Sequence, residues 1–364
     1  MHIGVTPSKK CSKNLIRVPK KIRENLGLDC GDWLVFETAE GKSSFRVEKA
    51  FLSDIEQFGD EKSFVSEGSL ILKESGEVYI KHHNLTIGCD PEFFLVNKKT
   101  RNVLNAEVFF KREDQVGSDG PLGELRPDYS DTPQGLVTNL SNLILSLNSF
   151  LPKDVCPLAL SYNKGLCSGF HVHLGFPIEI LSFAADDTHK FINNIVYTLD
   201  YLVGIPTLFI DLDDRRRFSK EYGNPGDYRL NMRTLEYRTP GGYHLASPSL
   251  TQELLSLSFS VVSSIIKTSE ELTRNWTNMK PVLDFSSFRE RYNLPDKKSI
   301  RSIFYSDRNE ISKEREKAIN VLEAIKTING EPLRYSPEQT QNPEILENWL
   351  NAKTHCLRYH EKES

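Results

Sequence analysis

Four short strand-like segments between residues 87 and 240 each carry two charged or polar side chains spaced two positions apart. The pairs are Asp90 and Glu92, Glu124 and Arg126, His171 and His173, and Glu236 and Arg238. Successive side chains of a β-strand alternate between its two faces, so the members of each pair point to the same face. An apolar core does not require such pairs, and they are therefore the candidate functional residues.

The remaining pattern predicts a mixed fold. Helices are expected at 134–151, 187–203, 248–275, 309–328 and 337–353. In the first of these, Leu136, Leu140 and Ile144 recur at helical spacing and are assigned to the core. Strands and helices follow one another without a regular βαβ alternation, which favours an α+β fold over a doubly wound sheet.

The length of 364 residues suits two or three domains. The pattern of residues 1–50 predicts a small β-rich unit with one short helix. The pattern of residues 51–84 predicts a charged connector with strands at 69–72 and 78–80. We expect a catalytic domain over 85–300 and a helical segment over 301–364.

Composition excludes several classes of protein. Hydrophobic residues make up 38% and charged residues 26%, so the chain is not disordered as a whole. A net charge of −4 argues against a surface built throughout for nucleic acid or acidic lipid. We expect neither a secretory leader nor a bilayer-spanning run, and the six cysteines are scattered, which favours a reducing cytoplasm.

Each polar pair has a structural and a functional interpretation. Asp90 and Glu92 would repel each other on one face unless a cation lies between them, although a solvated strand edge is the simpler alternative. A strand with two imidazoles, at His171 and His173, suits a metal ligand or a phosphate contact. An acid beside a guanidinium, as at Glu124 and Arg126, can hold a phosphate or carboxylate, or can be a surface ion pair.

Arginines add further cations near Glu236 and Arg238. They are Arg215, Arg216, Arg217, Arg229 and Arg233. For Arg216 alone we expect a place in a solvated loop. Together, carboxylates, imidazoles and guanidiniums without a Ser or Cys nucleophile beside a base indicate magnesium-assisted phosphoryl chemistry.

The four segments resemble one family as an ordered set. They read Gly-x-Asp-Pro-Glu-Phe-Phe-Leu (88–95), Gly-Glu-Leu-Arg-Pro (123–127), Gly-Phe-His-Val-His-Leu-Gly (169–175) and Leu-Glu-Tyr-Arg-Thr-Pro (235–240). The set is similar to the phage-type carboxylate–amine ligases (amidoligase type 2) of the glutamine synthetase and glutamate–cysteine ligase superfamily. The resemblance implies a curved antiparallel sheet flanked by helices, with ATP and Mg²⁺ or Mn²⁺ on its inner face. It implies a ligase that phosphorylates a carboxylate and lets an amine displace the phosphate.

The resemblance also implies roles for individual residues. The expected metal ligands are Glu92, Glu124, His171 and Glu236, and the expected ATP contacts are His173, Arg229 and Arg215. Arg238 matches the arginine that stabilises the transferring phosphoryl group, and Arg126 is expected to contact the substrate carboxylate. Asp90 stands where many members of the superfamily have glutamate, so its shorter side chain is expected to act through water in the catalytic site.

Residues 1–50 resemble the AbrB/MazE-like swapped-hairpin family, through Ile16-Arg17-Val18-Pro19-Lys20-Lys21-Ile22-Arg23 and the Gly31-Asp32 turn. This implies a homodimer that completes one barrel from two chains, and a basic face able to contact DNA. The basic residues expected to be exposed are Lys9, Lys10, Lys13, Arg17, Lys20, Lys21 and Arg23. A small barrel used only for packing or dimerisation is the alternative.

Two other functions remain open at this point. The chain could be a DNA-binding regulator whose large domain is a degenerate ligand sensor, or a metal-dependent hydrolase or nucleotidyltransferase. A ligase yields ADP and phosphate only when carboxylate and amine are both present, a hydrolase needs no ATP, and a sensor turns nothing over.

Overall fold

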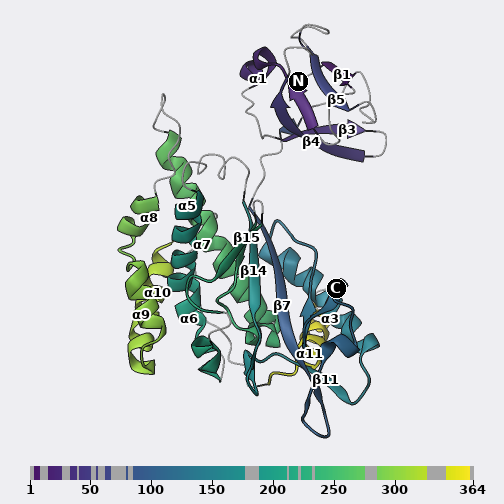
Figure 1. Cartoon of the computed structure of the whole chain (residues 1–364), viewed down its shortest axis with the longest axis vertical. Coiled ribbons are helices and arrows are strands. Elements are labelled where there is room, and N and C mark those ends of the chain that lie inside the picture. Colours follow the sequence, from purple (N-terminus) through teal and green to yellow (C-terminus); the bar gives the residue numbers. More distant parts are fainter. Residues whose placement is uncertain are drawn as a thin grey trace. The chain divides into compact units, whose positions relative to one another are not determined.

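The computed structural model describes residues 4–8, 15–26, 33–38, 41–50, 55, 62–66, 79–80, 85–176, 188–210, 213–219, 223–231, 234–274, 285–325 and 342–360. Every structural statement below concerns these residues. The chain divides into two compact units, one built from residues up to Asn84 and the other mainly from residues after it (Figure 1).

The first unit contains a sheet with the strand order β1-β5-β2-β4-β3-β6. The strands are β1 (Gly4–Ser8), β2 (Leu15–Val18), β3 (Trp33–Thr38), β4 (Gly41–Lys49), β5 (Lys62–Ser66) and β6 (Tyr79–Ile80). β5 pairs with β1 and β2, and β6 pairs with β3, so the segment expected as a connector supplies two strands of this sheet. The strand expected at 69–72 lies outside the described residues.

A short helix, α1 (Lys20–Leu26), follows β2 after Pro19. Lys20 and Lys21 are exposed, as the sequence predicts. The prediction that Arg17 is exposed is wrong, because only 6% of Arg17 is accessible. β2 lies between β4 and β5, in the interior of the sheet. Lys9, Lys10 and Lys13 lie outside the described residues, and the swapped hairpin, the homodimer and the DNA contact stay predictions.

The second unit is built on a sheet with the strand order β15-β16-β14-β7-β10-β9, whose paired strands are all antiparallel. Its strands are β7 (Thr86–Asn97), β9 (Val116–Asp119), β10 (Leu122–Leu125), β14 (Phe170–Gly175), β15 (Tyr228–Asn231) and β16 (Thr234–Tyr237), with β8 (Val103–Leu104) and β11 (Val155–Leu158) paired to the far end of β7. The predicted α+β class with a large antiparallel sheet is confirmed. A separate hairpin is formed by β12 (Tyr162–Asn163) and β13 (Leu166–Cys167).

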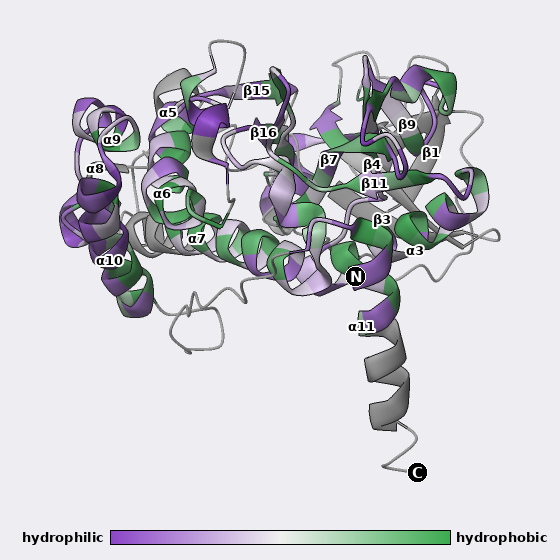
Figure 2. Cartoon of the chain, turned by 90° about the horizontal axis from the view of Figure 1, so that it is seen from below, coloured by the Kyte–Doolittle hydropathy of each residue, from purple (hydrophilic) through white to green (hydrophobic). Residues whose placement is uncertain are grey.

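Helices cover one face of this sheet. The long helices α3 (Pro133–Phe150) and α7 (Pro248–Arg274) pack against each other, and α3 contacts β7 and β10 while α7 contacts β14. Figure 2 shows hydrophobic residues concentrated along both helices, with the strands forming a separate layer. Cys89, Phe93 and Leu95 of β7 are buried and alternate with Asp90 and Glu92, so the two carboxylates face away from the helices.

The remaining helices complete the second unit. They are α5 (Thr188–Leu199), a π-helical turn (Asp200–Gly204), α6 (Ile205–Thr207), α8 (Phe285–Arg291), α9 (Lys297–Phe304), α10 (Arg308–Ala324) and α11 (Ile345–His360), with 3-10 turns at Ala106–Val108, Asp214–Phe218 and Gly242–Ala246. The sequence pattern missed α8 and α9 because both are short and strongly charged. The start expected for the last helix, residue 337, lies outside the described residues.

The C-terminal helices lie in the same compact unit as the sheet. Trp349 Nε1 of α11 donates to the Leu245 carbonyl at 2.9 Å, and Asn348 donates to the Ala246 carbonyl at 2.8 Å.

Within the described residues, the part of α7 from Pro248 to Ile266 is long and apolar enough to cross a membrane, but half of that stretch is buried inside the protein. Its contacts with α3 and β14 are those of a core helix.

Candidate functional site

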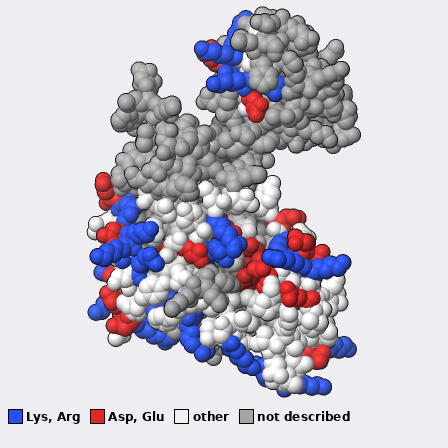
Figure 3. All heavy atoms as spheres, in the orientation of Figure 1, with Lys and Arg blue, Asp and Glu red and all other residues white. Residues whose placement is uncertain are grey.

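The register of the large sheet brings the predicted polar residues together on one face. His171 lies opposite Asp90, His173 lies opposite Glu236, and Glu124 lies opposite Glu92. Directly opposed residues of an antiparallel ladder point to the same face. Arg229 of β15 also lies opposite Glu236, so the polar row runs across five neighbouring strands. In Figure 3 acidic and basic side chains adjoin in the region where Figure 1 draws β7, β14 and β15.

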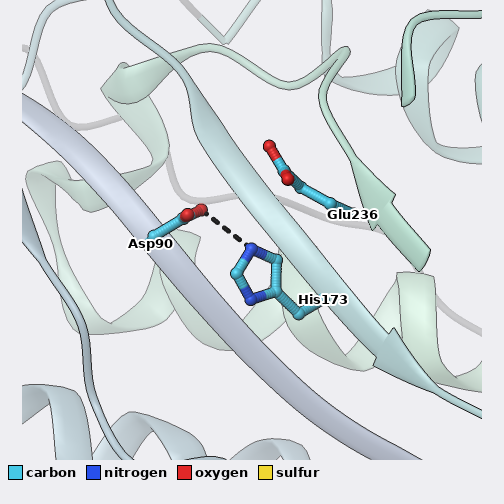
Figure 4. Close-up of side chains that lie close together, drawn as sticks. All are labelled: Asp90, His173 and Glu236. Atoms are coloured by element: carbon cyan, nitrogen blue, oxygen red, sulfur yellow. Dashed lines mark ion pairs between the residues drawn. The ribbon is translucent and has the colours of Figure 1, made fainter. Parts of the chain in front are cut away.

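Three side chains from three strands converge most closely. One ligand atom each from Asp90, His173 and Glu236 all lie within 4.8 Å of one another (Figure 4). Nε2 of His173 lies 3.1 Å from Oδ1 of Asp90. These two atoms and Oε1 of Glu236 are buried without a well-formed hydrogen bond within the protein. Charged groups lie 3.1–3.7 Å from these atoms without aligned hydrogen bonds, an arrangement that is compatible with a cation bound among them.

His171 and two arginines surround the same cluster. Nδ1 of His171 lies 3.3 Å from Asp90 Oδ1 and 3.7 Å from Glu236 Oε1. Arg238 Nε lies 3.3 Å from Glu236 Oε1, and an Arg229 guanidinium nitrogen lies 3.6 Å from the same oxygen. The Arg238 side chain is 13% exposed and that of Arg229 is 65% exposed. One arginine is therefore held at the cluster while the other reaches into solvent.

The electrostatics of the cluster favour its charged forms. Burial raises the pKa of Asp90, but the adjacent His171 and His173 imidazoles outweigh that effect and hold the pKa of the carboxyl below its usual range. Burial lowers the pKa of His173, and the Asp90 and Glu236 carboxylates outweigh it and raise the pKa above that of free histidine. The Asp90 carboxyl and the His173 imidazole thus shift each other's pKa in opposite directions.

Glu92 and Glu124 lie beside this cluster, and both are buried. Glu92 Oε2 accepts a hydrogen bond from the Gly169 amide at 2.7 Å. Glu124 forms an ion pair with Arg126, whose guanidinium also donates to the carbonyls of Asp114 at 3.0 Å and Ser118 at 3.4 Å. These two glutamates are engaged within the protein, and Arg126 keeps a third of its side chain exposed.

The arginines of the 3-10 turn Asp214–Phe218 differ in their exposure and in their hydrogen-bond partners. Arg215 pairs with Asp213 at 2.5 Å and lies over the Tyr162 ring at 4.4 Å, with most of its side chain exposed. The prediction that Arg216 lies in a solvated loop is wrong, since it is 5% exposed. Its guanidinium donates to the carbonyls of Thr239 at 2.6 Å and Arg238 at 3.0 Å. Such bonds to backbone more than twenty residues away leave no local sequence signal.

A glycine makes the burial of Arg216 possible. Gly223 has φ +84°, and a Cβ atom there would lie 2.3 Å from the Arg216 guanidinium. Arg217 is also buried and donates to the carbonyls of Phe304 at 2.7 Å and Ser306 at 3.1 Å. The turn is therefore anchored to the segment that carries Arg238 and to the end of α9.

The cluster of Asp90, His173 and Glu236 fits a divalent metal ion. Two carboxylates and one imidazole form a donor set that Mg²⁺ or Mn²⁺ accepts. The grouping differs from the assignment of roles made on the motifs, because Asp90 and His173 are among the three converging residues and Glu92 and Glu124 are not.

Comparison with known proteins identifies the family. Residues 87–328 match the family described as phage phiEco32-like COOH.NH2 ligase-type 2. This stretch is well over half of the chain, so the protein belongs to that family, as the four motifs predict. The match covers all of the polar pairs described above.

No curated protein matches this chain significantly. Among solved structures, a bifunctional glutathione synthetase from Pasteurella multocida is 11% identical with a TM-score of 0.38, over 66% of this chain and 49% of that one. A glutamate–cysteine ligase from Francisella tularensis in complex with AMP is 9% identical with a TM-score of 0.31, over 75% of this chain and 99% of that one. The matched part spans about half the length of the glutathione synthetase.

Proposed function

We propose that this protein is an ATP- and Mg²⁺-dependent carboxylate–amine ligase that forms an amide through an acyl phosphate. The observation that carries the proposal is the cluster of Asp90, His173 and Glu236 on one sheet face, with Arg238 in contact, in a chain of the COOH.NH2 ligase family. A hydrolase would need an activated water but no nucleotide, and two arginines beside a metal cluster are better suited to phosphate groups.

In the proposed site, Asp90, His173 and Glu236 hold Mg²⁺ or Mn²⁺. The bound ion would supply charge neutralisation for the phosphate oxygens. Glu92 and Glu124 lie opposite each other on β7 and β10 beside this group, and with His171 they are proposed to hold a further ion.

The arginines have separate proposed roles. Arg238, largely buried and fixed at Glu236, neutralises the charge that develops on the transferring phosphoryl group. Arg229 reaches into solvent and contacts the ATP phosphates. Arg215 is a weaker candidate for a nucleotide contact because it must first leave Asp213. Arg126 contacts the substrate carboxylate through the exposed part of its guanidinium.

The proposed reaction has two steps. A carboxylate oxygen of the substrate attacks the γ-phosphorus of ATP, which forms an acyl phosphate and releases ADP. The amine nitrogen then attacks the acyl carbon and loses a proton, and phosphate leaves with the former carboxylate oxygen. A carboxylate is a poor electrophile, and phosphorylation gives it a leaving group. The protein contributes electrostatic stabilisation and positions the reactants.

An untargeted search for amide products tests this function. The protein is incubated with ATP, Mg²⁺ and a cell extract, and mass spectrometry compares products of the wild type, Glu236→Ala and the exposed control Glu113→Ala. We expect a new amide with the wild type and the control but not with Glu236→Ala. Hydrolysis products formed without ATP would support a hydrolase, and no change in any metabolite would support a sensor.

A further inference from the structure

A buried carboxylate lies behind the site and is not among the motif residues. Asp200 opens the π-helical turn after α5 and is 0% exposed. Three donors converge on it: the Gly226 amide at 2.6 Å, the Thr239 hydroxyl at 2.8 Å and the Tyr237 hydroxyl at 3.1 Å. Isolated π turns are uncommon and are frequently found at functional sites.

The three donors belong to the segments that carry the site arginines. Tyr237 and Thr239 are the neighbours of Arg238 on either side, so Asp200 holds the strand end from the face opposite to Arg238. Gly226 lies in the turn that leads into β15 and Arg229. Asp200 therefore joins the end of β16 to the turn before β15 through side-chain contacts.

Hydrogen bonds donated by two backbone amides also support the connection between the end of β16 and the turn before β15. The Arg238 amide donates to the Asp227 carbonyl at 3.3 Å, and the Gly223 amide donates to the Asp227 carboxylate at 3.1 Å. Gly226 has φ +86°, and a Cβ atom there would lie 2.7 Å from the Tyr197 hydroxyl. The turn is thus closely packed against α5, with its amide directed at Asp200.

Burying this carboxyl is unfavourable, which argues against a role in stability alone. Burial raises the pKa of Asp200 to about 7, although the hydrogen bonds from Thr239, Gly226 and Tyr237 act in the opposite direction. A neutral side chain would fill the same space at a lower desolvation penalty.

We propose that Asp200 is a positioning residue that holds Arg238 and the turn before Arg229 in register with the metal cluster. The proposal rests on the proposed function, because its consequence is the placement of two arginines that contact phosphate. Asp200 itself acts through Tyr237, Thr239 and Gly226.

Hydrogen exchange tests the connection without reference to activity. In Asp200→Asn, exchange of the Gly226 amide should rise by at least about tenfold, because a charged acceptor is replaced by a weaker one. Tyr201→Phe is the matched control, since its hydroxyl lies on the same π turn but contacts Glu314 at 3.4 Å. The control should leave exchange at Gly226 unchanged.

Kinetics test the consequence for the reaction. ADP formation is followed with Mg·ATP, hydroxylamine as the amine and the small-molecule fraction of a cell extract. Asp200→Asn should lower kcat by about tenfold or more while KM for ATP changes less than about threefold, because the misplaced Arg238 acts on the transition state. The double variant Tyr237→Phe/Thr239→Val should move kcat in the same direction, and Tyr201→Phe should not.

The pH profile separates positioning from general stability. The ionised carboxylate accepts all three bonds, so wild-type kcat should fall as pH drops through about 7. Asp200→Asn should lack this acid limb and approach the wild type at low pH. The described titratable groups that act on Asp200 are Tyr237, Asp227 and Tyr305, and they remain in the variant.

Wild-type kcat and unchanged Gly226 exchange in Asp200→Asn would overturn the proposal. If that variant does not fold, the double variant Tyr237→Phe/Thr239→Val decides, and wild-type exchange and kcat in it would contradict the role. If the wild type itself forms no ADP, the proposed function fails, while the exchange data still decide whether Asp200 holds the turn.

Discussion

Nε2 of His173 lies 3.1 Å from Oδ1 of Asp90, on neighbouring strands of the large sheet. Two ligands bound at right angles to one Mg²⁺, each about 2.1 Å away, are separated by roughly 3 Å. The spacing of the two atoms is compatible with the proposed Mg²⁺ site, in which Glu236 would be the third ligand from the next strand.

This geometry predicts that Asp90→Asn, His173→Gln and Glu236→Gln each weaken Mn²⁺ binding by at least about tenfold, because each removes either a carboxylate charge or the imidazole ligand. Mn²⁺ titrations followed by electron paramagnetic resonance measure the affinity, and the exposed Glu113→Gln serves as control. Equal affinities for all four variants and the wild type would show that the metal binds elsewhere.

Arg238→Lys should lower turnover by roughly 10²- to 10³-fold while the affinity for ATP changes little, because a point charge cannot replace a planar guanidinium at the transferring phosphoryl group. Steady-state kinetics give turnover, and calorimetry with Mg·ATP gives affinity. A matching loss of affinity would assign Arg238 to nucleotide binding instead.

The adjacent residues Arg215 and Arg216 provide a matched pair for stability. Arg216→Lys should reduce the free energy of unfolding by about 2–3 kcal/mol, since a lysine cannot serve both the Arg238 and Thr239 carbonyls. Arg215→Lys should leave stability unchanged, because the Arg215 side chain is exposed. Urea unfolding compares the two, and equal effects would contradict the structural role of Arg216.

His244 predicts a pH dependence of folding. Burial lowers its pKa to about 4; its Nδ1 lies 3.0 Å from the Gly241 carbonyl, and Arg216 is nearby. Between pH 6.5 and 4 the unfolded chain binds a proton that the folded chain does not, so stability falls with falling pH by up to about 1.4 kcal/mol per unit. His244→Gln should remove this part of the dependence. Parallel stability curves for the variant and the wild type would refute it.

The sequence predicted which polar residues of each strand share a face but not how the strands bring them together. Strand alternation correctly grouped Asp90 with Glu92 and His171 with His173. Which side chains converge depends on the register between β7, β14 and β16, and that register is set by contacts distant in sequence. For this reason Asp90 and His173 converge with Glu236. The family resemblance had instead implied metal binding by Glu92, Glu124, His171 and Glu236.

Buried charge was the least predictable feature. A run of acids and arginines is typical of a solvated turn, yet Arg216 and Arg217 are buried because backbone carbonyls of distant segments accept their hydrogen bonds. Asp200 follows an apolar helix and meets its partners only after the chain has returned through β15 and β16. Helices with a strong apolar stripe, such as α3 and α7, were located to within a few residues.

The most direct test of the central claim follows the fate of ATP. The protein is incubated with Mg·ATP, hydroxylamine and the small-molecule fraction of a cell extract, and ³¹P spectroscopy and mass spectrometry quantify the nucleotides and hydroxamates. The account predicts ADP, phosphate and a hydroxamate in equal amounts, all absent with Glu236→Ala. Formation of AMP and pyrophosphate, or of hydroxamate without ATP, would contradict it.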